Sequence, residues 1–352
     1  MENIIRLIQA FAKKLNRRIN LMEVCGTHTV AIFKHGIRSL LPENIKLLSG
    51  PGCPVCVTPI EDIDRFLYIA SQPDVIITTF GDMMRVPGSN GSLYKAKAEG
   101  ADIRMVYSPL DALKIAAENK EKKVVFFAVG FETTSPLIAA TISEAERQNI
   151  PNFYIYSVHK LVPPALEALA NTEELKLDGF ILPGHVSTII GSKVYEFIPS
   201  KYKKACVISG FDADDILNSI AMLLKQIIEN EAKVEIQYTD AVKPEGNKKA
   251  RDFINIYFAT CDSNWRGIGI IKESGLKLKN EFSHRDASSV FDIPLINSKE
   301  PPGCKCGLVL RGLIIPPQCP LFAKICTPEN PVGACMVSSE GSCAAYYKYG
   351  QS

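Results

Sequence analysis

The cysteines form the clearest chemical pattern in this sequence of 352 residues. Six of the eleven follow Pro302, and in a reducing compartment such clustering is more typical of metal, cluster or redox thiols than of structural disulfides. Their spacing matches neither the ferredoxin run Cys-x2-Cys-x2-Cys-x3-Cys nor the paired Cys-x2-Cys of a zinc ribbon. Six thiols exceed the four that a tetrahedral metal or a four-iron cluster needs, so we predict four cluster ligands and one redox-active pair. A single zinc with two spare cysteines is the alternative. The six residues are Cys304, Cys306, Cys319, Cys326, Cys335 and Cys343.

A second pattern is Cys-Pro-Val-Cys, formed by Cys53 and Cys56. Between a strand and a helix, two cysteines at this spacing indicate a dithiol/disulfide couple, in which the helix N-terminus acidifies one thiol. Half of a zinc site is the alternative. A structural zinc normally requires a second such pair, and the sequence contains no matching one, so the redox couple is the favoured interpretation.

A third pattern places Cys25 and His28 on either side of a glycine turn. A thiolate binds iron strongly, and the imidazole would hold the thiol deprotonated or lie beside a bound ligand. A buried cysteine with a hydrogen-bonded histidine is the structural alternative. His185, in Pro-Gly-His-Val-Ser, is a further polar candidate for the same cleft.

These motifs follow short apolar runs that alternate with helical periods, which predicts an α/β fold with parallel sheets covered on both faces. Since ligands of open parallel sheets bind at the carboxyl ends of the strands, six glycine-bearing turns at that edge predict a single cleft. The predicted strands span residues 45–49, 74–80, 104–107, 124–129, 153–158, 179–182 and 206–209, and the helices 61–71, 111–119, 135–148 and 214–230.

The element order predicts two successive α/β units, at residues 18–120 and 121–232, followed by a mixed domain at 233–352 that contains the cysteine-rich tail. Apolar residues recur at helical spacing in residues 1–17, and we expect this amphipathic helix to pack onto the third domain.

Composition excludes several classes of protein. The 40 basic and 38 acidic residues leave a net charge of +2, which does not favour nucleic acid or an anionic membrane as a partner. No apolar stretch has the length of a membrane span, and the N-terminal segment does not resemble an export signal, so a cytoplasmic location is expected. Neither Gly-x-Gly-x-x-Gly nor a phosphate loop occurs, so the sequence does not support ATP or NAD as a cofactor.

From Leu21 to Tyr349 the sequence resembles the HypD family, maturation factors for nickel–iron hydrogenases. The resemblance is carried by long motifs: Met-Glu-Val-Cys-Gly-Thr-His-Thr, Gly-Pro-Gly-Cys-Pro-Val-Cys-Val, Thr-Phe-Gly-Asp-Met-Met-Arg-Val-Pro-Gly, Gly-Phe-Glu-Thr-Thr, Pro-Gly-His-Val-Ser and Met-Val-Ser-Ser-Glu-Gly-Ser-Cys. It implies two Rossmann-like α/β domains and a mixed C-terminal iron–sulfur domain.

The resemblance also implies a function. HypD, with its small partner HypC, is the scaffold on which an iron atom transiently carries two cyanides and one carbon monoxide. HypE supplies the cyanides, and the hydrogenase large subunit receives the finished unit. By this resemblance Cys25 would bind the iron with His28 beside it, and Cys53 and Cys56 would be the redox dithiol. The iron unit is expected to contact residues of three motifs: Cys25, Glu132, Thr133 and His185.

The tail would carry a 4Fe-4S cluster, but the resemblance leaves its ligands open. We assign Cys306, Cys319, Cys326 and Cys343 as ligands and Cys304 with Cys335 as a redox disulfide candidate. Exchanging Cys304 for Cys306 is equally compatible with the spacing. The expected electron path runs from the cluster through the thiols to the iron at Cys25.

A different class of function fits the same cysteines. An iron–sulfur thiol/disulfide oxidoreductase acting on a partner protein would require Cys53 and Cys56 but neither Cys25 nor His28. The sequence does not decide whether the protein turns over a substrate as an enzyme.

Overall fold

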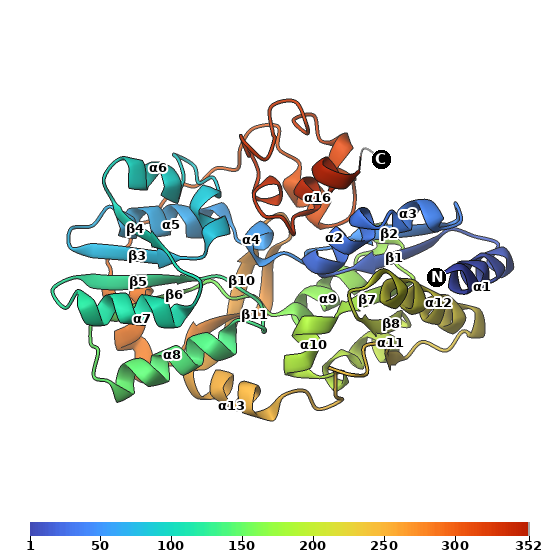
Figure 1. Cartoon of the computed structure of the whole chain (residues 1–352), viewed down its shortest axis with the longest axis horizontal. Helices are drawn as coiled ribbons and strands as arrows, with labels where there is room; N and C mark the ends of the chain where they lie inside the picture. Colours follow the sequence, from blue (N-terminus) through green and yellow to red (C-terminus); the bar gives the residue numbers. More distant parts are fainter. Residues whose placement is uncertain (351–352) are drawn as a thin grey trace.

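Two parallel β-sheets lie at opposite ends of the long axis of the molecule, with a hairpin and the cysteine-rich segment between them (Figure 1). The structure, a computed structural model, describes residues 1–350. The predicted α/β class with two parallel sheets and a separate cysteine-rich region is confirmed. Residues 351–352, the end of the predicted third domain, lie outside the described part.

The first sheet, sheet A, has five parallel strands. Two of its three inner strands are buried along their whole length, as expected for a sheet covered on both faces. In spatial order the strands are β2 (Ile45–Ser49), β1 (Ile19–Glu23), β7 (Gly179–Pro183), β8 (Ala205–Ser209) and β9 (Val234–Ile236).

The second sheet, sheet B, has four parallel strands. They are β4 (Asp102–Met105), β3 (Val75–Thr79), β5 (Lys123–Ala128) and β6 (Phe153–Ser157), again in spatial order. An antiparallel hairpin of β10 (Phe258–Trp265) and β11 (Gly269–Leu278) forms the third sheet.

Helices connect the strands, and their first residues explain where several begin. Ser108 and Asp212 each form a capping box with an aspartate three residues later, which satisfies amide groups that the first helical turn leaves free. The helices are α1 (Glu2–Lys14), α2 (Gly26–Lys34), α3 (Ile37–Leu40), α4 (Pro54–Val57), α5 (Ile60–Ala70), α6 (Leu93–Ala98), α7 (Pro109–Glu118), α8 (Ser135–Arg147), α9 (Val162–Ala170), α10 (Gly184–Ile190), α11 (Phe197–Tyr202), α12 (Ala213–Glu229), α13 (Lys248–Tyr257), α14 (Ala287–Val290), α15 (Cys306–Leu310) and α16 (Ser342–Tyr349).

The strands are not grouped as the predicted units 18–120 and 121–232 required. Sheet A combines β1 and β2 with β7 and β8, and it also takes β9 from the region assigned to the third domain. Sheet B combines β3 and β4 with β5 and β6. The chain crosses to sheet B after β2 and returns after β6. Hydrophobic periodicity identifies strands but not their partners, which is why the sequence suggested a contiguous division.

The N-terminal helix also packs elsewhere than expected. Ile8 and Ala12 of α1 are buried in one cluster with Ile216 and Ile220 of α12, and Figure 1 shows α1 at the end of sheet A, away from the cysteine-rich segment. An apolar stripe indicates that one helix face is buried, but any apolar surface can cover it.

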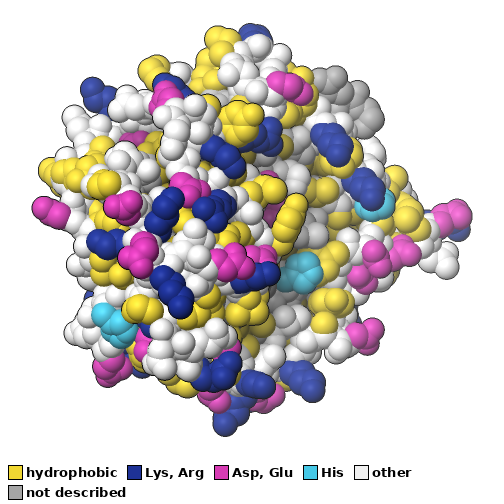
Figure 2. Space-filling model, turned by 60° about the vertical axis from the view of Figure 1, so that its left-hand side comes forward, with side chains coloured by type: hydrophobic (Ala, Val, Ile, Leu, Met, Phe, Trp, Pro, Cys, Tyr) yellow, Lys and Arg dark blue, Asp and Glu magenta, His cyan; other side chains and the backbone are white. Residues whose placement is uncertain are grey.

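One large hydrophobic cluster joins the two sheets to the cysteine-rich segment. It includes Met22 of β1, Phe127 of β5, Trp265 at the end of β10 and Val309 of α15. On the face drawn in Figure 2, basic and acidic side chains are interspersed, in keeping with the small net charge. Among residues 1–350, no helix has the length and apolar character needed to cross a membrane.

Candidate functional site

Both sheets have a point where the chain connections diverge, and four of the candidate residues lie at these points. In sheet A the chain leaves β1 toward β2 on one side and leaves β7 toward β8 on the other. Sheet B diverges in the same way between β3 and β5. Ligands of open α/β sheets bind at such divergence points. Cys25 and His28 follow β1, His185 follows β7, and Glu132 follows β5.

Cys25 caps the N-terminus of α2 and is buried. Burial raises the pKa of its thiol to about 12; the backbone amide groups of His28 and Thr27 oppose this shift, and the charges of Glu340 and Glu23 add to it. Cys25 is therefore a protonated thiol at neutral pH as long as no cation replaces its proton.

Glu23 is a buried carboxyl group that the sequence analysis did not single out. Its Oε1 accepts a hydrogen bond of 2.6 Å from the Thr29 hydroxyl, and its Oε2 accepts one of 3.2 Å from the Cys25 amide. Burial raises the pKa of Glu23 to about 7, against the effect of these hydrogen bonds. The only signal in the sequence is a glutamate that follows the apolar residues Leu21 and Met22 at the end of a strand. Glu23 anchors the turn that presents Cys25.

His28 is a neutral imidazole whose proton can be placed. Its Nε2 lies 2.9 Å from the Gly210 carbonyl oxygen and 3.3 Å from that of Ser209. Since carbonyl oxygens only accept, Nε2 carries the proton and Nδ1 presents a lone pair. Nδ1 is buried and has no partner within the described residues. Burial lowers the pKa of His28 to about 4, so the ring accepts hydrogen bonds at neutral pH and does not act as a cation.

His185 reaches the same place from sheet A. Its ring stacks on Phe211 at 4.0 Å between centroids, and His28 contacts Phe211 at 4.9 Å. His185 is exposed, and partial burial lowers its pKa. The three rings thus run from the buried His28 to the surface.

Glu132 reaches the site from sheet B. Its Oε1 accepts a 2.9 Å hydrogen bond from the Val162 amide, whereas the buried Oε2 has no partner among the described residues. Burial raises the pKa of Glu132 to about 7. Burial also raises the pKa of Tyr195, and the charges of Glu132 and Cys25 raise it further. Glu132, which follows a strand of sheet B, and Cys25, which follows a strand of sheet A, thus act on the same buried hydroxyl group. The neighbouring Thr133 is exposed.

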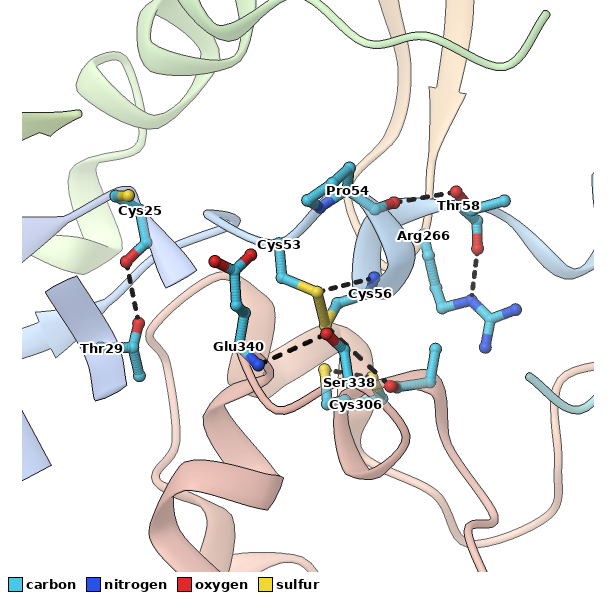
Figure 3. Close-up of a disulfide and its surroundings, with 12 residues drawn as sticks. Cys25, Thr29, Cys53, Pro54, Cys56, Thr58, Arg266, Cys306, Ser338 and Glu340 are labelled. Atoms are coloured by element: carbon cyan, nitrogen blue, oxygen red, sulfur yellow. Dashed lines mark hydrogen bonds between the residues drawn. A yellow bond between two sulfur atoms is a disulfide. The ribbon is translucent and has the colours of Figure 1, made fainter. Parts of the chain in front are cut away.

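Cys53 and Cys56 form a disulfide, with their Cα atoms 5.2 Å apart (Figure 3). Both are buried, and the Cys53 sulfur accepts a hydrogen bond of 3.2 Å from the Cys56 amide at the start of α4. Proline at the first position of α4 needs no amide partner, which suits this helix start.

The turns that carry Cys25 and Cys53 touch directly. The Gly26 amide donates to the Gly52 carbonyl oxygen at 2.9 Å. A Cβ atom on Gly52 would lie 2.3 Å from the Cys25 nitrogen, so only glycine allows this approach.

Glu340 closes the site from the cysteine-rich segment. Its Oε1 accepts a 2.9 Å hydrogen bond from the Thr27 hydroxyl, and its Cβ lies so close to Gly26 that a side chain there would collide with it. Figure 3 shows Glu340 between Cys25 and the disulfide. Within the sequence, its place in the motif Met-Val-Ser-Ser-Glu-Gly-Ser-Cys is the one signal that could have identified it.

All six cysteines of the tail line one small cavity, together with the apolar side chains of Leu321, Phe322 and Met336. The donors are thiols only and the surroundings are apolar, which suits an iron–sulfur cluster better than a hard cation. No three His, Cys, Asp or Glu side chains within residues 1–350 are arranged to hold a single metal ion.

Within this cavity the thiols lie close together. The Cys335 sulfur lies 2.7 Å from the Cys306 sulfur, and the side chains of Cys304 and Cys343 contact these two residues in turn. The pairing of Cys304 with Cys335 and the ligand role of Cys306 stay predictions. Spacing along the chain did not separate Cys304 from Cys306, because they are only two residues apart. The start of α15 turns Cys306 inward, where it is buried, while Cys304 is half-buried.

The disulfide adjoins this segment. The Cys56 sulfur lies 4.0 Å from the carbonyl oxygen of Ala334, the residue before Cys335, and α4 packs against the short helix η6 (Ala334–Met336). The structure therefore places two cysteine pairs on adjacent elements, with Cys25 on the turn beside the first pair.

Comparison with known proteins matches residues 1–350 to HypD, described as the hydrogenase formation hypA family. The chain belongs to the HypD family. It is 45% identical over 358 residues to the hydrogenase maturation factor HypD of Escherichia coli, covering 99% of this chain and 96% of that protein. It is 47% identical over 349 residues to a putative hydrogenase expression/formation protein of Methanocaldococcus jannaschii, covering 99% and 97%. The HypD of Azotobacter vinelandii is 47% identical over 342 residues, or 95% and 90%.

Membership of the HypD family confirms the predicted resemblance. Of the residues that the resemblance singled out, the structure brings Cys25 and His28 together with the disulfide of Cys53 and Cys56, and it places the six tail cysteines around one cavity. Glu132 and His185 lie at the divergence points of the two sheets, whereas Thr133 is directed to the surface.

Proposed function

We propose that this HypD-family chain is the scaffold on which an iron atom, held at Cys25, receives two cyanide ligands and one carbon monoxide during hydrogenase maturation. HypC would complete the scaffold, HypE would supply the cyanides, and the hydrogenase large subunit would receive the finished unit. The supporting observation is the direct contact between the Cys25 turn and the Cys53 turn, next to the cysteine-lined cavity. We place these events in the cytoplasm, where thiols stay reduced.

The residues around Cys25 suit an iron unit with cyanide and carbonyl ligands. Such iron prefers soft donors, and the cation would replace the proton that the buried thiol otherwise keeps. His28 Nδ1 and Glu132 Oε2 are buried polar atoms without a hydrogen-bond partner within residues 1–350, so both are free to contact such ligands. Because its pKa is about 7, Glu132 is protonated in much of the population near neutral pH, and a protonated Oε2 donates a hydrogen bond to a cyanide nitrogen.

For the tail we propose a 4Fe-4S cluster with Cys304, Cys319, Cys326 and Cys343 as ligands and Cys306 with Cys335 as the redox pair. We base this set, which exchanges Cys304 for Cys306 in the one assigned from spacing, on the 2.7 Å separation of the Cys306 and Cys335 sulfurs. A cluster bound there supplies single electrons. The chain contributes the adjoining disulfide of Cys53 and Cys56, which takes up two electrons and two protons when it opens.

The test is co-purification of the chain with HypC under anaerobic conditions, followed by infrared spectroscopy of the cyanide and carbonyl bands. Cys25→Ala is expected to lose these bands. Cys261→Ala, which removes a half-buried thiol outside the site, is the matched control and should retain them. A complex of Cys25→Ala that carries a stable iron–dicyanide–carbonyl unit would refute the proposal.

The alternative is a thiol/disulfide oxidoreductase that acts on a partner protein. The disulfide next to the cysteine-lined cavity favours it. The burial of both sulfur atoms counts against it, because a partner's thiol must reach one of them. A Cys25→Ala variant that retains full disulfide reductase activity would favour this second function.

A further inference from the structure

Arg266 is a buried arginine that neither the sequence motifs nor the proposed function uses. It follows Trp265 at the tip of the β10–β11 hairpin and is 2% exposed. Its Nη1 and Nη2 have no hydrogen-bond partner within the described residues. Its nearest carboxylate, Glu300, lies 3.6 Å from Nε and is itself half-exposed. A buried guanidinium with two unpaired nitrogens is costly, so its position requires an explanation.

The hairpin tip holds Arg266 against the disulfide loop. The Arg266 amide donates to the Val57 carbonyl oxygen at 2.9 Å, and its Nε donates to that of Thr58, also at 2.9 Å. These two acceptors are the residues directly after Cys56. Figure 3 shows the Arg266 side chain beside α4.

The same tip touches the cysteine-rich segment. A Cβ atom on Gly267 would lie 2.1 Å from the Cα atom of Gly307, the residue after Cys306, so the two backbones are in contact. Arg266 therefore brings a permanent positive charge to the junction between α4, which carries Cys56, and the segment that carries Cys306.

We propose that Arg266 is a positioning residue that makes the Cys53–Cys56 disulfide easier to reduce. A dithiol such as dithiothreitol opens the disulfide by transferring two electrons and two protons to it, and the reagent becomes a cyclic disulfide. Each cysteine that then ionises to a thiolate releases its proton to solvent. A positive charge in a buried environment stabilises a thiolate and hence the reduced pair. The two hydrogen bonds to Val57 and Thr58 keep that charge beside the pair. The inference rests on the redox role proposed above for Cys53 and Cys56.

The experiment equilibrates the full-length chain, purified anaerobically, with dithiothreitol buffers of graded ratio. Alkylation and mass spectrometry of the peptide that contains both cysteines then give the equilibrium constant for reduction. Arg266→Met is expected to lower this constant about tenfold, which corresponds to a midpoint about 30 mV more negative. Arg266→Lys keeps the charge but loses the hydrogen-bonding geometry, and should stay within about twofold of the wild type.

Two further variants separate charge from folding. Arg266→Gln loses the charge but retains a donor for the Thr58 carbonyl. It should therefore lower the equilibrium constant for reduction as Arg266→Met does, and it provides the test if the methionine variant does not fold. Arg285→Met removes another buried arginine, which binds Glu146 of α8 and the Phe153 carbonyl at the start of β6, and should leave the constant unchanged.

An unchanged constant in folded Arg266→Gln, or equal shifts in the lysine and glutamine variants, would overturn the inference while leaving the redox role of the pair intact. An equal shift in Arg285→Met would also overturn it. If the wild-type disulfide cannot be reduced reversibly, the redox part of the proposed function and this inference are both wrong.

Discussion

Gly52→Ala tests whether the contact between the Cys25 and Cys53 turns controls the site. The added Cβ would lie 2.3 Å from the Cys25 nitrogen, 2.5 Å from its Cα and 2.6 Å from its carbonyl carbon. All three are backbone atoms, so no side-chain rotation relieves the collision, and Cys25 must move. The hydrogen bond from the Gly26 amide to the Gly52 carbonyl oxygen must stretch as well.

The expected cost follows from two contributions. Overpacking of a well-packed interior costs about 1–3 kcal/mol, and a weakened backbone hydrogen bond adds about 1 kcal/mol. A total of about 3 kcal/mol lowers Tm by about 4 °C in a chain of 352 residues, because the entropy of unfolding is about 2.1 cal/mol/K per residue. The larger effect is functional, because a displaced Cys25 no longer lies where the iron unit is assembled.

Calorimetry of the variant and infrared spectroscopy of its HypC complex measure the two effects. Gly100→Ala is the control: Gly100 has a φ of +106° and open space around its Cβ position, so alanine there costs about 1–3 kcal/mol of strain without touching the site. The control should lose stability and retain the cyanide and carbonyl bands, whereas Gly52→Ala should lose both. Normal bands and a normal Tm in Gly52→Ala would refute the steric argument.

Three further predictions follow from the cavity, the buried carboxyl group and the N-terminal helix. In anaerobic reconstitution with iron and sulfide, Cys304→Ser should lose the cluster, while Cys306→Ser should retain about four irons by elemental analysis; the opposite result would restore the ligand set assigned from spacing. Glu132 has a pKa of about 7 when folded and an ordinary value of 4.5, so the folded state keeps a proton that the unfolded state loses, and stability falls as the pH rises through that interval. Urea unfolding at pH 5 and pH 8 should show that the free energy of unfolding falls less in Glu132→Gln than in the wild type, by up to about 3 kcal/mol. An identical pH dependence in the two proteins would contradict the raised pKa of Glu132. Ile8→Ala, in the fully buried face between α1 and α12, should cost about 3 kcal/mol in the free energy of unfolding and speed amide hydrogen exchange in α1; unchanged exchange would mean that α1 is held by other contacts.

Much of the local structure could be predicted from the sequence. The apolar runs at 124–129 and 179–182 became β5 and β7, because buried parallel strands need continuous apolar residues. Ser108 and Pro109 mark the start of α7 through chemistry that acts within one helical turn. The order of the strands within the sheets could not be predicted in this way. β1 pairs with β7, more than 150 residues later, and nothing in either segment specifies that partner.

The same distinction between local features and long-range contacts holds for the candidate site. The sequence by itself determined the types of residue and their turns: Cys25 after β1, the Cys53–Cys56 pair at the start of α4 and six thiols in the tail, because motif chemistry depends on spacing along a few residues. Only the tertiary structure decided which distant groups meet. It set Cys306 against Cys335, buried Glu23 and Glu132 deeply enough to raise their pKa to about 7, and brought Arg266 to the disulfide. Burial and contact between remote segments arise from packing, and no local pattern in the chain encodes them.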